Sequence, residues 1–177
     1  MTDTTKICAI IGCTPEAFPW GWDEEDETCA AMKLVMMNRI TLARSHGVTR
    51  FHVSMDSGAG LYAAEIIHQL RETDRGIKLH GYVPYEEQAT KWTPELRDRY
   101  FNTLAACSEV KNVSYEKSVG CEFRTHIHAI VDAGTVIAVF DSGNPLCERE
   151  VAAGIVAKML GKQVHIIDPI AIKLSKN

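Results

Sequence analysis

Short apolar runs alternate along this chain with longer segments in which apolar residues recur every three or four positions. Short, mostly apolar runs that end near turn-forming residues predict buried strands. They lie at 7–11, 50–53, 78–83, 109–113, 135–140 and 164–167. The alternation therefore predicts six strands with a helical segment between each neighbouring pair.

The helical segments are recognised by spacings of three and four between apolar residues. The first carries Cys29, Met32, Met36, Ile40 and Ala43 on one face and stops at Gly47. Its start lies beside the acidic run 23–27, where negative charge suits the helix dipole. The other segments run over 61–70, from the Thr93-Pro94 cap to Cys107, over 121–131, and over 146–160, where Val151, Ile155 and Met159 form the apolar face.

Strands that alternate with helices pair in parallel through right-handed crossovers. We therefore expect an α/β fold with a Rossmann-like, doubly wound, mostly parallel sheet in three layers, α/β/α. The absence of linkers and repeats in the sequence predicts one domain over 1–177 with its core at about 7–169. Ligands of such folds bind beyond the carboxyl ends of the strands, so the loops after 11, 53, 83, 113 and 140 carry the candidate chemistry.

Composition narrows the function classes. The 177 residues are 46% hydrophobic and 24% charged, with a formal charge of −4, which is typical of a globular domain. No apolar run is long enough to cross a bilayer or to resemble a signal peptide, so we expect a cytoplasmic protein without a membrane partner. The absence of a Lys/Arg cluster argues against direct binding of nucleic acid. Assembly into a homo-oligomer stays open.

Cysteine and histidine spacings predict no metal site. The six cysteines form no C-x-x-C pair, so we expect six free thiols, with Cys13 and Cys121 the most reactive because each lies beside a loop or a helix start. His126 and His128 are two residues apart on a predicted helix and would point to different faces.

The loop after the second strand has the spacing of a phosphate-binding turn. Gly58, Gly60 and Ala63 satisfy G-x-G-x-x-A between a strand and a helix, directly after Ser54 and Ser57. Glycines let backbone N–H groups approach a phosphate at a helix N-terminus. The alternative is a tight turn that needs small residues. NAD redox chemistry is disfavoured because the next strand closes without an acidic residue to bind the ribose.

Two further loops carry groups that suit a nucleotide. If 85–92 forms a helical turn, Tyr85, Gln88 and Trp92 share one face, where they could stack on a base and read its edge. The alternative is an aromatic cap over the core. The segment Asp141-Ser142-Gly143-Asn144 precedes a helix and forms either a plain turn or a second phosphate nest.

The chain resembles the YpsA-like family of the SLOG superfamily, which also includes DprA-type proteins and the LOG nucleotide hydrolases. The resemblance covers roughly 7–169. Its motifs are Pro84-Tyr85-x-x-Gln88-x-x-x-Trp92, then 61–65, then Tyr115 with Gly120-Cys121 and Arg124, then Val131-Asp132 leading into 137–141. It implies a Rossmann-like fold with a pocket for a nucleotide or a nucleotide derivative as ligand, and it places Arg124 at that pocket, where the alternative is a salt bridge to Asp132 or Asp141.

Three ligand loops depart from the family pattern. Ile11-Gly12-Cys13-Thr14-Pro15 stands for Thr-Gly-His-Arg-Pro, Gly60 stands at the place of an acid, and Gly143-Asn144-Pro145 stands for Gly-Gly-Thr. We therefore expect Gly12 and Thr14 to contribute to a changed ligand site and hold three hypotheses. The first is a nucleotide binder or sensor without catalysis. The second is a nucleoside-monophosphate phosphoribohydrolase that uses Glu65 or Glu148. The third is a partner-binding scaffold with a vestigial pocket.

Overall fold

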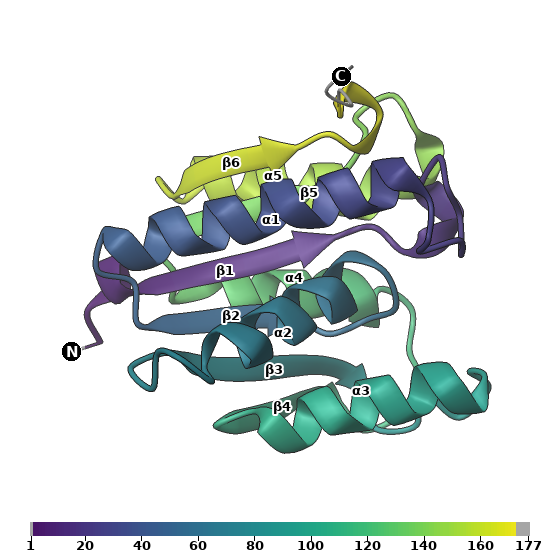
Figure 1. Ribbon diagram of the computed structural model, residues 1–177, viewed down its shortest axis with the longest axis horizontal. Helices are drawn as coiled ribbons and strands as arrows, with labels where there is room; N and C mark the ends of the chain where they lie inside the picture. The colour runs from purple at the N-terminus through teal and green to yellow at the C-terminus, as the bar shows by residue number, and fades with distance from the viewer. Residues whose placement is uncertain (1, 173–177) are drawn as a thin grey trace.

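The computed structural model describes residues 2–172, and within them six strands form one parallel sheet (Figure 1). The strands are β1 (Ile7–Gly12), β2 (Arg50–Ser54), β3 (Lys78–Tyr85), β4 (Glu109–Ser114), β5 (Thr135–Val139) and β6 (Gln163–Ile167). Their order across the sheet is β4-β3-β2-β1-β5-β6. The predicted α/β fold with a parallel sheet is confirmed.

Helices cover both faces of the sheet. The α-helices are α1 (Glu27–Ser45), α2 (Ala59–Leu70), α3 (Pro94–Ala106), α4 (Cys121–Val131) and α5 (Glu148–Met159). Figure 1 shows α1, α2 and α3 in front of the sheet and α4 and α5 behind it, which gives three layers. Short 3₁₀ helices span Thr4–Lys6, Pro15–Ala17, Pro145–Cys147 and Pro169–Ala171.

The strand order changes direction at β1: β2, β3 and β4 follow on one side of it, and β5 and β6 lie on the other. Ile10 of β1 pairs with Val53 of β2 on one side and with Ile137 of β5 on the other. The chain therefore leaves β1 toward one edge of the sheet and later returns to its other side. Such a switch point opens a crevice at the carboxyl ends of the strands, where α/β proteins bind ligands.

Local signals in the sequence explain where the helices begin and end. Oδ1 of Asp26 accepts hydrogen bonds from the backbone N–H groups of Thr28 and Cys29, at 2.7 and 3.4 Å, and so caps α1. Thr93 caps α3 in the same way through the N–H of Leu96. Gly47, with φ of +97°, follows the C-cap of α1, where few residues other than glycine are tolerated.

The apolar face predicted for the last helix is wrong. Ile155 and Met159 are 55% and 81% exposed, and Val151 is only partly buried. Small residues face the sheet instead, because a Cβ at Gly154 would lie only 3.3 Å from the ring of Phe140. The helix thus packs close to the sheet and leaves its larger apolar side chains outside. The helical turn that a shared face of Tyr85, Gln88 and Trp92 required does not form: Tyr85 ends β3, and hydrogen-bonded turns follow it.

Candidate functional site

A cleft of about 910 Å³ opens at the carboxyl edge of the sheet. Each of the five strand-to-helix connections, or the helix start that follows it, contributes side chains to its lining. These are Thr14, Glu16, Trp22, Glu24, Asp56, Ser57, Lys91, Trp92, Thr93, Glu95, Leu96, Arg99, Glu122 and Arg149. Its size is within the usual range of small-molecule sites, and its position is the one expected of a doubly wound sheet.

Four charged side chains beside the cleft form a group that we call the Arg99 cluster: Glu24, Lys33, Glu65 and Arg99. Of these, Glu24 and Arg99 line the cleft. The Arg99 guanidinium donates to both oxygens of Glu24, at 2.7 and 3.0 Å, and to both oxygens of Glu65, at 2.8 and 2.9 Å. Lys33 adds a 2.6 Å hydrogen bond to Glu24. Burial works against ionisation of Glu24, but the hydrogen bonds from Arg99 and Lys33 hold its pKa below the ordinary value.

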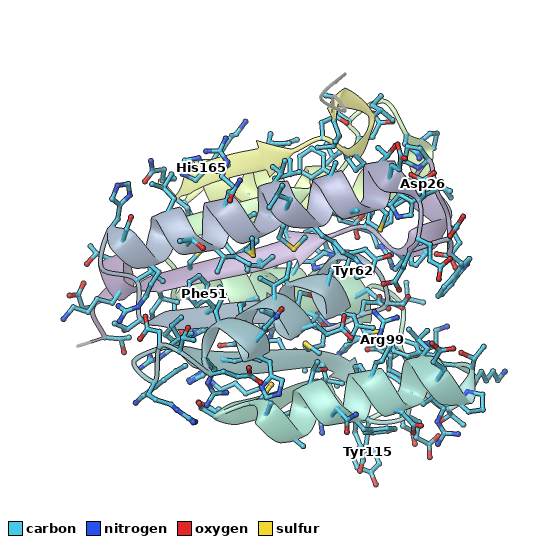
Figure 2. All side chains as sticks on the ribbon, in the orientation of Figure 1. Asp26, Phe51, Tyr62, Arg99, Tyr115 and His165 are labelled. Atoms are coloured by element: carbon cyan, nitrogen blue, oxygen red, sulfur yellow. A yellow bond between two sulfur atoms is a disulfide. The ribbon has the colours of Figure 1, made fainter. Side chains whose placement is uncertain are left out.

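The Arg99 cluster joins three separate segments. Glu24 and Lys33 lie in the connection that leads into α1 and on α1 itself, and Glu65 lies on α2. Arg99 lies on α3 (Figure 2). Charge-assisted, two-oxygen contacts of this kind fix geometry as well as adding energy. The cluster therefore sets the position of α3, and with it the part of the cleft that Trp92 lines.

Asp56 lies in the cleft lining just beyond β2 and is partly exposed. Its Oδ1 accepts from the N–H of Ser57 at 2.7 Å and from Nε2 of Gln88 at 3.4 Å. Burial raises the pKa of this carboxyl to about 6, and the Ser57 hydrogen bond opposes that rise. The group therefore changes its protonation state near neutral pH.

Behind this lining lies a second polar group, the buried trio of Ser54, His126 and Glu150. Nε2 of His126 donates to Oε1 of Glu150 at 3.0 Å, because an ionised carboxylate can only accept. Nδ1 then accepts from the Ser54 hydroxyl at 2.7 Å. The chemistry resembles a serine-hydrolase triad, but none of the three side chains belongs to the cleft lining. A nucleophile must reach its substrate, so the trio is a buried hydrogen-bond network.

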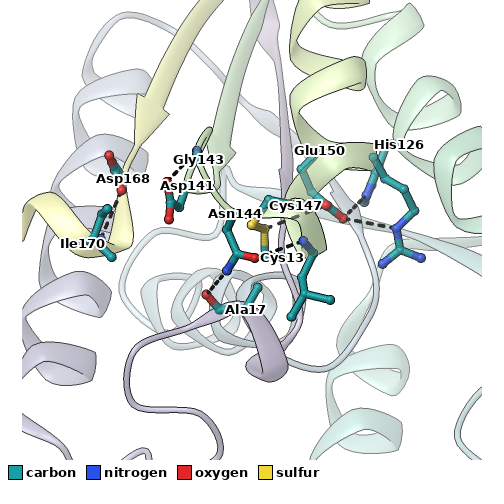
Figure 3. The surroundings of a disulfide bond; sticks show 12 residues. Cys13, Ala17, His126, Asp141, Gly143, Asn144, Cys147, Glu150, Asp168 and Ile170 are labelled. Atoms are coloured by element: carbon teal, nitrogen blue, oxygen red, sulfur yellow. Dashed lines mark hydrogen bonds and ion pairs between the residues drawn. A yellow bond between two sulfur atoms is a disulfide. The ribbon is translucent and has the colours of Figure 1, made fainter.

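A disulfide joins Cys13, after β1, to Cys147, at the start of α5 (Figure 3). Their Cα atoms are 5.9 Å apart, and Sγ of Cys13 lies 3.8 Å from Oε2 of Glu150. The prediction of six free thiols is therefore wrong for this pair. It failed because the two cysteines, 134 residues apart in sequence, meet only through the sheet topology. Cys121 is fully buried, and burial raises the pKa of its thiol, so the expected activation by the helix start is also wrong.

Of the predicted site residues, Thr14, Ser57 and Trp92 line the cleft. Gly12, Gly58 and Gly60 do not; they allow close packing of backbone instead. A Cβ at Gly58 would lie 2.7 Å from the Cys13 carbonyl oxygen, and one at Gly60 would collide with the Ser54 carbonyl. A Cβ at Gly12 would collide with Cβ of Ala59, at the start of α2.

The predicted aromatic face is divided between two hollows. Tyr85 and Gln88 line a neighbouring depression of about 580 Å³, which shares Lys91 and Trp92 with the cleft. Trp92 packs edge-on against Tyr100, with ring centroids 4.9 Å apart. The Nε2 of Gln88 donates to the Met55 carbonyl at 3.0 Å, so this amide is anchored to the backbone beyond β2.

Other predicted residues make local contacts outside the cleft. Arg124 donates to the carbonyl of Val119 and the hydroxyl of Ser118, and it pairs with neither of the aspartates considered for it. Oδ1 of Asp141 accepts from the N–H of Gly143 at 2.8 Å. Asn144 caps a 3₁₀ turn and donates to the carbonyl of Ala17 (Figure 3).

The two carboxylates considered for catalysis are not part of the cleft lining. Glu65 is held by Arg99, and Glu148 is exposed at the start of α5. Sequence reasoning missed Asp56, which could have been noticed as an acid directly after a buried strand. It also missed Arg99, His126, Arg149 and Glu150, which no local spacing marks. Within residues 2–172, no three His, Cys, Asp or Glu side chains are grouped to hold a metal ion.

Comparison with known proteins decides the family. The model of YpsA, described as the YspA SLOG family, matches residues 9–168. The chain belongs to this family. Membership in the YpsA family confirms the resemblance carried by the motifs at 61–65, 84–92, 115–124 and 131–141.

Relatives of this YpsA-family chain are known from Bacillus. It is 27% identical over 111 residues to a UPF0398 protein of Bacillus pumilus, a match that spans 62% of this chain and 59% of that protein. A UPF0398 protein of Bacillus licheniformis is 26% identical over the same length, with 60% of it covered. One of Bacillus cereus is 23% identical over 143 residues, 79% of this chain and 77% of that protein. The match thus spans about three fifths of the first two relatives.

A solved structure shares the fold. DNA processing protein A from Helicobacter pylori, described for its single-stranded DNA binding mode, superposes with a TM-score of 0.58 at 13% sequence identity. The match covers 93% of this chain and 66% of that one. At this identity the similarity shows the fold alone. No helix within residues 2–172 is long and apolar enough to span a membrane.

Proposed function

We propose that this YpsA-family protein binds a nucleotide-derived small molecule in the cleft at the carboxyl edge of its sheet. The observation that carries the proposal is the cleft itself, to which each of the five strand-to-helix connections, or the first turns of the helix that follows it, contributes. Its lining combines Trp22 and Trp92 with hydrogen-bonding groups such as Ser57 and Thr14. Aromatic faces suit a base, and convergent polar groups fix its orientation.

Binding without catalysis is the form of this function that the lining supports best. The carboxylates considered for N-glycosidic hydrolysis, Glu65 and Glu148, lie outside the lining. The serine of the buried trio does not line the cleft either. Direct binding of single-stranded DNA, described for the Helicobacter pylori protein, is disfavoured because, among residues 2–172, five carboxylates line the cleft against three cations.

The proposal is tested by identifying what the purified protein carries and then measuring its affinity. Small molecules released by denaturation are analysed by mass spectrometry, and the compound found is titrated back by calorimetry. We expect a base-containing molecule. We also expect Trp92→Ala to weaken its binding by about tenfold or more, from the loss of stacking. A labelled single-stranded oligonucleotide serves as a parallel titrant, and we expect no binding.

The matched control is Arg124→Ala, which removes an exposed side chain outside the cleft and should leave affinity unchanged. Because Trp92 packs against Tyr100, Trp92→Phe is measured beside Trp92→Ala; it keeps a ring and should retain most of the affinity. Equal loss of affinity in the Arg124 variant, or tight binding of the oligonucleotide alone, would contradict the proposal.

A further inference from the structure

Few cations in the cleft are free to bind a phosphate. All the hydrogen bonds of the Arg99 guanidinium within residues 2–172 go to two carboxylates. Arg149 lies between Glu122 and Glu150, 3.9 and 3.7 Å from their oxygens. Only Lys91, exposed at the rim, lines the cleft without an ion pair to any residue from 2 to 172.

More carboxylates than cations in the cleft lining have no ion-pair partner among residues 2–172. Glu16 and Glu95 line the cleft and form no ion pair with the residues that the structure describes, and Asp56 likewise has no cation within 4 Å among them. A phosphate dianion placed among these groups would be repelled. The charge of the cleft therefore favours a neutral ligand.

The glycines whose backbone N–H groups were predicted to bind a phosphate do not line the cleft. Gly58 and Gly60 are buried against the carbonyls of Cys13 and Ser54. The N–H of Gly143 is used by Asp141. An anion nest needs several free N–H groups converging on one point, and the cleft lining includes none of these three glycines.

The Asp56 carboxylate and the Ser57 hydroxyl lie side by side in the lining, where they can form hydrogen bonds with two neighbouring hydroxyl groups of a ligand. Only Oδ1 of Asp56 accepts hydrogen bonds within residues 2–172, and Gln88 and the Ser57 N–H hold it in place. Its other oxygen remains as an acceptor. The Ser57 hydroxyl lies beside it in the lining, although the residue is only 5% exposed. Carboxylates bind ribose hydroxyls in this way in dinucleotide folds.

We propose that the ligand is an unphosphorylated ribonucleoside, with its ribose diol on Asp56 and Ser57 and its base against Trp92. This inference rests on the proposed function and narrows it. A neutral ribose needs no anion site, and residues 2–172 provide none in the cleft. Its hydroxyls explain why an acid, Asp56, belongs to the lining. Gln88 acts as a positioning residue, because it holds Asp56 and the Met55 carbonyl without lining the cleft.

Calorimetry with matched ligands tests the proposal. For each of the four common bases, the ribonucleoside, its 2′-deoxy analogue and its 5′-monophosphate are titrated at pH 7.5. We expect one ribonucleoside to bind at least about tenfold more tightly than its monophosphate. Its deoxy analogue should bind about tenfold more weakly, since a polar group of the protein is then left unpaired.

Two substitutions separate the sources of selectivity. Asp56→Asn should remove most of the preference for ribose over deoxyribose. Glu95→Lys should raise the affinity for the monophosphate, relative to that for the nucleoside, about tenfold. Glu72→Lys, which adds the same charge outside the cleft, is its control and should leave this ratio unchanged. Circular dichroism and urea unfolding establish that each variant is folded.

The outcomes distinguish the two proposals. A monophosphate that binds as tightly as its nucleoside, or a deoxy analogue that binds equally well, overturns the nucleoside assignment. If Trp92→Ala still weakens that monophosphate, the proposed function stands. Absence of binding by all twelve compounds, together with no base-containing molecule released from the purified protein, overturns both.

Discussion

The Arg99 cluster and the buried trio are both polar networks beside the same cleft, but they lie in different surroundings. The side chains of the Arg99 cluster are 25–33% exposed, so water shares their charge. Glu150 of the buried trio is 1% exposed and depends on protein groups alone. A buried charge that loses its partner is far more costly than a surface charge that does. We therefore expect the buried trio to determine whether the residues behind the cleft lining fold, and the Arg99 cluster to determine how α3 is positioned beside the cleft.

The largest effect should come from breaking the trio. Glu150→Ala removes the acceptor of His126 and leaves Ser54 and His126 buried with an incomplete network. We expect the free energy of unfolding in urea to fall by about 3–5 kcal/mol. Glu148→Ala, two residues earlier and exposed, is the control and should change it by less than about 0.5 kcal/mol. If Glu150→Ala and Glu148→Ala lowered stability equally, burial of the Glu150 carboxylate would not be the reason for its contribution.

The second-largest loss of stability should follow from reducing the disulfide, whose Cys13 lies beside Glu150. Reduction of Cys13–Cys147 should lower the free energy of unfolding by about 2–5 kcal/mol, because the unfolded chain gains freedom. The same bond predicts four titratable thiols in denatured, unreduced protein and six after reduction. Six thiols before reduction would contradict the bond.

Disrupting the Arg99 cluster should lower the free energy of unfolding by less than either of the two changes above. Arg99→Ala removes four charge-assisted hydrogen bonds from partly exposed groups, and we expect a loss of about 1–3 kcal/mol that shrinks in high salt. Arg97→Ala, on the same helix and exposed, is the control. The loss should also weaken ligand binding, since α3 is no longer fixed against α2. If Arg99→Ala lowered the free energy of unfolding as much as Glu150→Ala, the exposed Arg99 cluster and the buried trio would not differ in their contribution to stability.

The smallest effect on stability concerns Asp56, which belongs to neither network, and it should have the opposite sign. Burial raises the pKa of this carboxyl from 3.8 to about 6; the charge of Arg149 opposes the rise, and that of Glu122 adds to it. The protonated form is therefore favoured by folding, and this stabilisation is lost as pH rises through 6. Asp56→Asn should leave stability at about pH 4 unchanged and raise it at about pH 8 by about 1–2 kcal/mol. A variant less stable than the wild type at both pH values would contradict this.

The fold was largely predictable because its signals are local. All six strands and five helices lie where the apolar pattern places them, and α4 has the predicted bounds. The burial expected of every strand is wrong for the edge strand β4, which is exposed or only partly buried. The burial of α5 was not predictable, since Gly154 and its neighbours pack against Phe140 through a contact that no periodicity records. Small residues then carry the buried face that larger apolar residues were expected to carry.

The candidate site was predictable only in position. The carboxyl ends of parallel strands pointed to Thr14, Ser57 and Trp92, which do line the cleft. Its charged and buried groups depend on pairs far apart in sequence, such as Ser54 with His126, separated by 72 residues. Glycine spacing was ambiguous, because the same small residues serve a phosphate or a close approach of backbone.

The most direct test of the central claim is a crystal structure of the protein grown with the nucleoside that calorimetry ranks first. We predict that the ligand occupies the cleft, with ribose hydroxyls within hydrogen-bonding distance of the Asp56 carboxylate and the base against Trp92. A ligand bound instead at the opposite edge of the sheet, in the depression of about 290 Å³ that Arg39 and His46 line, with the cleft empty, would contradict the account.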